Sequence, residues 1–310
     1  MTVTALPTAR PLEPPRNGGP SSALPLAPPP REEREIALPD YVPPEAASSS
    51  PWRRALDSSA WRQAALLALL AASWETAARL ADNDLLLPTF GAAARALWEG
   101  LAGGELLLRA GLSLKLLLQG YALGVVLALG LTALATSSRW GRDLLSSLTA
   151  MFNPLPAIAL LPLALLWFGL GAGSLVFVLV HAVLWPLALA ASAGFASVPE
   201  TLRMAGRNYG LTGPRYVAQI LLPAALPSIL SGLRVGWAFA WRTLIAAELF
   251  FGASSGQGGL GWYIFQNRNE LQTDRVFAGL ALVILIGWLV ERLVFSTIER
   301  ATVRRWGMQR

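Results

Sequence analysis

Two residues of opposite charge, Arg242 and Glu248, lie within an apolar stretch that is long enough to cross a bilayer. Charges at membrane depth are costly, so they are expected to face protein or water and to be paired. Six positions is a poor helical spacing for pairing with each other, so each is expected to meet a neighbouring helix or a second copy of the chain. Two roles stay open: Arg242 lines a pathway for an anionic solute, or both charges form structural ion pairs. Arg234 lies nearer one end of the stretch and is expected to reach head groups or a partner protein.

Other chemistry is limited by the residue types that are missing. A nucleotide-binding P-loop needs Gly-Lys before Ser or Thr, but the only lysine, Lys115, follows Leu114. Cysteine is absent and the single histidine, His181, lies in an apolar stretch, so neither a metal site nor a Ser-His-Asp set is expected. The glycine-rich run 256–261 follows an apolar stretch and not a soluble strand, which favours a flexible extracellular turn. We expect no catalytic residue, no metal and no cofactor on this chain.

The composition indicates lipid as the solvent. Of the 310 residues, 54% are hydrophobic and 14% are charged, and the mean hydropathy is +0.47; soluble domains carry about 25% charged residues. The net charge of +6 comes from arginines that are not gathered into one patch, and several of them stand at the ends of apolar segments. That placement is typical of a membrane-orientation signal, so no nucleic-acid partner is expected.

Residues 1–57 differ from the rest of the chain. Thirteen of the 22 prolines precede Trp52, and no apolar run reaches the length of a signal-peptide core. Such a segment buries too little apolar surface to offset its ordering entropy. We expect a disordered cytoplasmic tail over 1–57, with a proline-rich ligand as the alternative, and a membrane domain over 58–310.

Six apolar stretches come near the length of about 20 residues that a membrane-spanning helix needs. They cover residues 61–81, 112–136, 149–168, 174–195, 227–251 and 275–298. If the N-terminus is cytoplasmic, the inside loops hold most of the arginines, as the positive-inside rule requires. Recurrent small residues within the stretches suit close helix packing. The predicted fold class is an all-α polytopic protein of six transmembrane helices, with both termini in the cytoplasm.

A polar segment of roughly thirty residues joins the fourth and fifth apolar stretches. Pro199 and Glu200 suit the first turn of a helix, and Gly210 suits its left-handed end. A second short helix is expected to follow, ended by Pro223 before Pro227 opens the fifth span. The pattern predicts two short helices with a glycine elbow, forming a compact knob on the cytoplasmic face.

This segment resembles the docking loop in permease subunits of bacterial binding-protein-dependent ABC importers. That loop has the form Glu-Ala-Ala, three residues, Gly, nine residues, Ile-x-Leu-Pro. Ala205, Gly210, the nine residues 211–219 and the run 220–223 (Ile-Leu-Leu-Pro) fit it. Met204 stands where the family often has Glu, and Gly206 where it has the second Ala.

Residues from about 60 to 308 are also similar to the nitrate, sulfonate and taurine branch of that family. Examples are Gly232-Leu233-Arg234, Ala247-Glu248 and the ending from Glu299 to Trp306.

The resemblance implies a type I importer permease in a bacterial inner membrane. Its partners would be two ABC ATPase subunits, which carry the ATP and Mg, a second permease copy and an extracytoplasmic solute-binding protein. The solute would be a small oxyanion such as nitrate, a sulfonate or taurine. The residues assigned to the ATPase-docking loop are Glu200, Met204, Ala205, Gly206, Arg207, Gly210, Ile220, Leu222 and Pro223.

Three alternatives remain. An ion-coupled secondary transporter would show an internal inverted repeat and helices broken at the midplane, and the sequence gives no convincing repeat. A membrane-embedded enzyme would need ionisable residues clustered on facing spans. A scaffold without transport activity is compatible with the long tail. Only the ABC permease predicts a stoichiometric ATPase partner.

Overall fold

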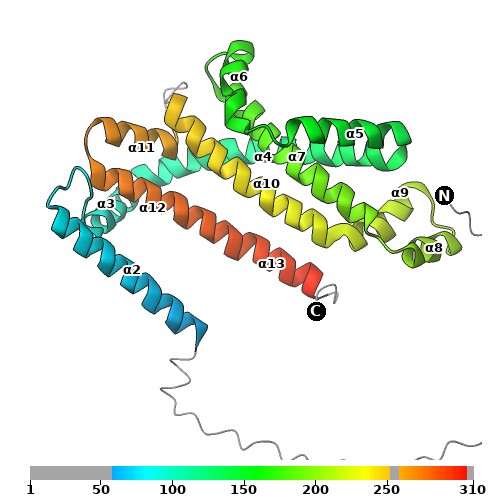
Figure 1. Cartoon of the computed structure of the whole chain (residues 1–310), viewed down its shortest axis with the longest axis horizontal. Coiled ribbons are helices and arrows are strands. Elements are labelled where there is room, and N and C mark those ends of the chain that lie inside the picture. The colour runs from blue at the N-terminus through cyan, green and yellow to red at the C-terminus, as the bar shows by residue number, and fades with distance from the viewer. Residues whose placement is uncertain (1–57, 252–257, 306–310) are drawn as a thin grey trace, which may run out of the picture. The chain divides into compact units, whose positions relative to one another are not determined.

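The computed structural model describes residues 58–251 and 258–305 (Figure 1). These residues form helices and connecting turns, with no strand among them, which confirms the all-α prediction. The tail over 1–57 lies outside the described residues, so its predicted disorder and its boundary stay predictions.

Five helices of the described part are long and apolar enough to cross a membrane. They are α2 (Ser59–Ala81), α4 (Glu105–Ser137), α7 (Ala172–Ala196), α10 (Leu222–Phe251) and the helix that begins as α12 (Thr273–Leu289). The last of these continues through η3 (Val290–Phe295), α13 (Ser296–Glu299) and η4 (Arg300–Arg304), where η3 and η4 are π-helical turns. It therefore extends beyond the predicted end at residue 298.

The third span is not the continuous helix that was predicted over 149–168. α5 (Arg139–Phe152) and the segment of η1 (Ala157–Leu160) and α6 (Leu161–Phe168) meet at an angle of 89°. Pro154 and Pro156 occupy the break, where they lack N–H groups and disfavour helical geometry in the residues before them. Pro162 is tolerated because it lies in the first turn of α6. Counted as one broken span, the pair brings the total to six.

The centre of the bundle is formed by α4, α7 and α10, which pack closely along small residues. A Cβ on Gly120 would come within 2.5 Å of the Leu179 side chain, and one on Gly232 within 2.7 Å of Ala190. Glycine at these positions lets the helix backbones approach closely, as the sequence predicts. Such close packing holds membrane helices together, because lipid offers no hydrophobic drive for them to associate.

Two helices were not predicted from the sequence. α3 (Phe90–Ala102) lies between the first two spans and packs on α12, and α11 (Leu260–Asn269) fills the connection between α10 and α12. Both are shorter than a span, so hydropathy alone gives them no signal. α11 is nevertheless deeply packed, with Leu260 and Tyr263 almost fully buried.

Candidate functional site

The polar segment between α7 and α10 forms the predicted pair of short helices, here called the knob (residues 199–221). α8 (Glu200–Asn208) begins directly after Pro199, and Gly210 follows it with φ of 69°. That left-handed conformation favours glycine, so the predicted elbow is confirmed. α9 (Gly213–Tyr216) and the π-helical turn η2 (Val217–Leu221) form the second arm.

The sequence predicted that the second arm ends at Pro223, and this prediction is wrong. η2 passes directly into α10 at Leu222, so Pro223 lies in the first turn of α10 and Pro227 lies inside that helix. A π-helical turn shifts the hydrogen-bond register, which lets the helix accommodate proline without stopping. The knob and the fifth span therefore share one continuous helix.

The two arms of the knob pack against each other at Gly206. A Cβ at this position would lie 2.9 Å from the Tyr216 ring and 3.0 Å from the Ile220 side chain, closer than carbon atoms normally approach. This contact gives a physical reason for glycine where the docking-loop pattern has alanine, because the Tyr216 ring fills the space that a methyl group would need.

Arg203 fastens the knob to the fourth span. Its guanidinium donates hydrogen bonds to the backbone carbonyl of Phe195 in the last turn of α7 (2.6 Å) and to that of Val198, two residues after the helix (3.2 Å). The last carbonyls of a helix lack the regular i+4 partner, so a guanidinium beside them is favourable. No role in the loop was predicted for Arg203; the available signal was its place in the first turn of a short helix that directly follows a span.

The remaining docking-loop residues present an exposed surface. Leu202, Met204 and Tyr209 are 44%, 49% and 85% exposed, and the charged Glu200 and Arg207 are exposed beside them. Among the other predicted residues, Leu222 is 42% exposed, Ala205 and Pro223 are half-buried, and Ile220 packs on Gly206. A rigid polar element that carries exposed apolar side chains is suited to binding another protein.

Glu248 is buried where α4, α10 and α11 pack together. With Ser113 it forms a group of hydrogen bonds to the start of α11, which we call the seat (Ser113, Glu248, Leu260 and Gly261). Glu248 is 5% exposed and accepts hydrogen bonds from the Ser113 hydroxyl (2.9 Å to each oxygen) and from the backbone N–H of Gly261 (2.8 Å). The N–H of Leu260 donates to the Ser113 oxygen at 2.9 Å. Side chains of α4 and α10 thus satisfy the first backbone donors of α11, which has no side-chain cap of its own.

The glycine-rich run is packed where the structure describes it. Gly258 and Gly259 are buried, Arg109 donates to the carbonyl of Gly258 at 2.9 Å, and a Cβ on Gly259 would overlap Ser113 and Glu248. The predicted flexible turn is therefore wrong for residues 258–261, and residues 252–257 lie outside the described part. Burial in the same region raises the pKa of the Tyr263 phenol on α11 above its ordinary value.

Arg242 and Glu248 do not pair with each other, and within residues 58–251 and 258–305 neither forms an ion pair with a third residue. The Arg242 side chain is exposed; its Nε donates to the Ala238 carbonyl at 3.0 Å, and its guanidinium lies 5.1 Å from the Phe239 ring centre. An exposed cation in a spanning helix needs water or another chain around it. Its predicted pathway role and an ion pair with a second copy both stay predictions.

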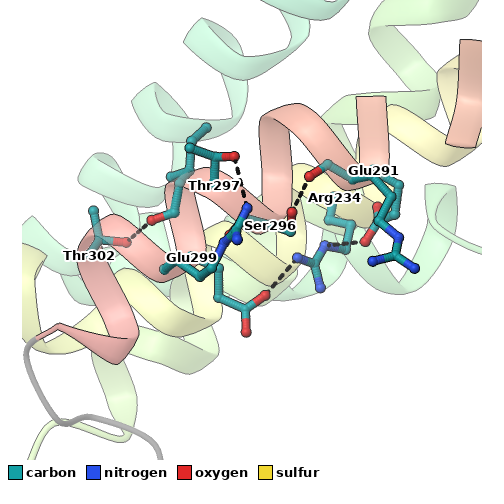
Figure 2. A network of polar contacts seen from close by, with 9 residues as sticks. Arg234, Glu291, Ser296, Thr297, Glu299 and Thr302 are labelled. Carbon is teal, nitrogen blue, oxygen red and sulfur yellow. Dashed lines mark hydrogen bonds and ion pairs between the residues drawn. The ribbon is translucent and has the colours of Figure 1, made fainter. Parts of the chain in front are cut away.

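Arg234 forms ion pairs inside the chain, so its predicted contact with head groups or a partner is not needed to satisfy its charge. Its Nε lies 3.0 Å from a carboxylate oxygen of Glu291, and its terminal nitrogen lies 2.8 Å from Glu299 (Figure 2). Both carboxylates belong to the C-terminal part of the last span. Sequence reasoning missed this site because the partners lie far along the chain from Arg234.

No group of three or more His, Asp or Glu side chains that could hold a metal ion occurs in the part of the chain that the structure describes. His181 packs against the rings of Phe152 and Trp185, with centroid distances of 6.3 and 6.0 Å.

Comparisons with known proteins match most of the membrane-spanning part. Residues 120–301 match the family described as the inner-membrane component of binding-protein-dependent transport systems. That range contains the knob, Arg242, Glu248 and both partners of Arg234.

Three relatives illustrate the similarity. A putative ABC transporter permease of Methanocaldococcus jannaschii is 32% identical over 231 residues, covering 73% of this chain and 85% of that protein. A putative aliphatic sulfonates transport permease of Escherichia coli is 32% identical over 236 residues, covering 76% and 88%. The taurine transport system permease of Escherichia coli is 34% identical over 196 residues, covering 63% and 66%.

Proposed function

Since the chain belongs to the family of inner-membrane components of binding-protein-dependent transport systems, and is therefore a multi-pass permease subunit of an ABC importer, we propose that it moves a small oxyanion as part of a homodimer. Two ATPase subunits dock on the two knobs, and a binding protein delivers the solute from outside. ATP and Mg are held by the ATPase subunits, and this chain binds no cofactor. Membership in this family argues against the alternative of an ion-coupled secondary transporter. The break between α5 and α6 is a feature that such transporters share.

The observation that carries the coupling mechanism is the continuity of the knob with the fifth span. α9, η2 and α10 form one helix, while Arg203 ties α8 to the end of α7. A push on the knob therefore reaches two central helices of the bundle directly. ATP-driven closure of the ATPase pair would move this lever and switch the bundle between inward and outward openings.

Arg242 supports the choice of an anionic solute. It is an exposed cation on a membrane-spanning helix, and the described residues supply it with no carboxylate. Relatives named for aliphatic sulfonates and taurine transport compounds that carry a sulfonate group, which such a cation attracts. We place Arg242 at the pathway between the two permease copies, where water or solute surrounds its guanidinium.

Reconstitution tests this proposal. The permease, its ATPase and its binding protein are placed in vesicles, and ATP-dependent uptake of taurine, an alkanesulfonate and nitrate is compared for the wild type, Arg242→Ala and Arg242→Lys. We expect Arg242→Ala to lower uptake about tenfold or more and Arg242→Lys to retain part of it, because lysine keeps the charge but loses the planar donor fork. Normal uptake by both assembled variants would remove Arg242 from the pathway, and a purified complex without an ATPase would end the docking proposal.

A further inference from the structure

Arg234 lies between two carboxylates and one aromatic ring of the last span, and we call this group the clamp (Arg234, Glu291, Phe295 and Glu299). The two ion-pair distances are 3.0 Å to Glu291 and 2.8 Å to Glu299 (Figure 2). The guanidinium carbon lies 5.9 Å from the Phe295 ring centre. Phe295 is 4% exposed and also contacts Trp237 of α10 at 6.4 Å between ring centroids. The clamp therefore joins a polar contact to the packed core between α10 and the last span.

The π-helical turn η3 explains how one arginine reaches both carboxylates. Glu291 and Glu299 are eight positions apart, which in a regular α-helix places them roughly 80° apart around the axis. A π-helical turn inserts about one extra residue, so eight positions act like seven and bring both side chains to one face. η3 covers Val290–Phe295, which includes Glu291 and the four residues after it. Such turns occur frequently at functional sites.

The other half of the clamp belongs to the helix that carries the knob. Arg234 lies twelve residues beyond Leu222 on α10, about 18 Å along the helix axis. No break separates it from η2 and α9. In Figure 1, α10 and the last span run side by side from α11 toward the knob. A displacement of the knob therefore reaches Arg234 through a continuous helix.

We propose that the clamp is the contact through which the sixth span follows the knob, so that Arg234 is a positioning residue for ATP-coupled transport. This inference rests on the proposed docking of an ATPase at the knob. The Arg234 side chain is 36% exposed, Glu291 50% and Glu299 18%, so the ion pair with Glu291 contributes little to overall stability and the pair with Glu299 is the better shielded of the two. Their role is to hold α10 and the last span in register while both helices move.

A charge exchange tests the ionic part of the clamp. Arg234→Glu is expected to lower transported solute per ATP hydrolysed about tenfold, because like charges push the last span away from α10. The triple variant Arg234→Glu, Glu291→Gln, Glu299→Arg re-forms one ion pair with opposite polarity and is expected to recover most of that ratio. Arg79→Gln is the matched control, because it removes an exposed pair with Glu75 at 2.8 Å within α2 and is expected to leave the ratio unchanged.

A covalent bridge tests the joint movement. The chain has no cysteine, so Arg234→Cys with Glu299→Cys gives one defined pair of thiols, which a short bis-thiosulfonate reagent joins through two reducible disulfides while sulfinate leaves. The unbridged pair is expected to couple poorly, and the bridged pair to transport near the wild-type ratio. If bridging arrests transport and reduction restores it, the two helices separate during the cycle and the inference is wrong.

Co-purification separates this inference from the docking proposal. Clamp variants are expected to keep a stoichiometric ATPase, whereas disruption of the knob is expected to lose it. A clamp variant that loses the ATPase would overturn the inference, because the clamp would then serve assembly. A wild-type complex that never binds an ATPase would instead refute the docking proposal.

Discussion

Glu248 shows how a residue can keep a buried carboxylate at membrane depth without an ion pair. Its oxygens meet a hydroxyl and a backbone N–H, and Ser113 passes a second hydrogen bond to the N–H of Leu260. The Ser113 hydroxyl and the N–H of Gly261 at the start of α11 satisfy the carboxyl oxygens where water is absent. The geometry therefore explains Glu248 as a cap for α11. Arg242, by contrast, has no carboxylate partner among the described residues.

Substitution of Glu248 distinguishes a cap from an ion-pair partner. Glu248→Ala leaves the donors of Ser113 and Gly261 without an acceptor, which is expected to cost about 1–3 kcal/mol per unsatisfied group. Glu248→Gln keeps one acceptor oxygen and the side-chain shape, so its loss is expected to be smaller. Thermal unfolding of the detergent-purified protein measures both. Equal losses for the two variants would favour an unseen cationic partner over the cap.

Gly259 provides an independent test of the same seat. Its φ is −80°, so alanine meets no backbone strain, and the added methyl group would overlap Ser113 and Glu248. Gly259→Ala is expected to destabilise the protein by about 1–3 kcal/mol through overpacking. The control is Gly111→Ala on α4, where nothing lies within 4 Å of the new Cβ. If Gly259→Ala is as stable as this control, the side chains of Ser113 and Glu248 move to accommodate the methyl group, and the expected overpacking is wrong.

At the scale of elements, the knob and the broken third span show how proline acts by context. Pro154 and Pro156 fall between helices and accompany a bend of 89°, whereas Pro223 and Pro227 lie in or near the start of α10 without ending it. Each proline removes a single N–H donor, a loss through which α10 continues at Pro223 and Pro227. Pro154 and Pro156 stand two residues apart and both disfavour helical geometry in the residues before them, which favours a break.

The contact between the arms of the knob gives a prediction at the element scale. Gly206→Ala is expected to push Tyr216 away and splay α8 from η2, lowering ATPase affinity about tenfold. Gly206→Ala with Tyr216→Leu removes the ring that the methyl group meets and should recover part of that affinity. Titration of the purified ATPase onto permease in nanodiscs gives the values. Undiminished affinity in Gly206→Ala would place the docking contact away from this packing.

For the whole molecule, the described residues form a bundle in which the knob, α10 and the clamp connect one end of the protein to the last span. The proposed orientation places the knob and the C-terminal end of the last span in the cytoplasm, and α11 outside. The excess of arginine in the loops on the knob side favours this orientation.

Cysteine labelling tests that orientation without background, because the chain has no native cysteine. A membrane-impermeant maleimide is expected to label Asn208→Cys only in inverted vesicles and Asn269→Cys only in intact spheroplasts; both positions are exposed. Labelling of both from the same side would require an even number of spans between them and would contradict the proposed topology, in which α10 alone lies between them.

The sequence by itself determined the apolar spans, the two-armed knob with its glycine elbow and the family. These follow from composition and from short-range spacing, as in the run from Gly210 to Pro223, which act locally along the chain. Tertiary structure alone decided the pairing of Ser113 with Glu248, which are 135 positions apart, and of Arg234 with Glu299, which are 65 apart. No local pattern encodes such contacts, because each depends on how close small residues let α4, α7 and α10 approach and on where a π-helical turn rotates the last span.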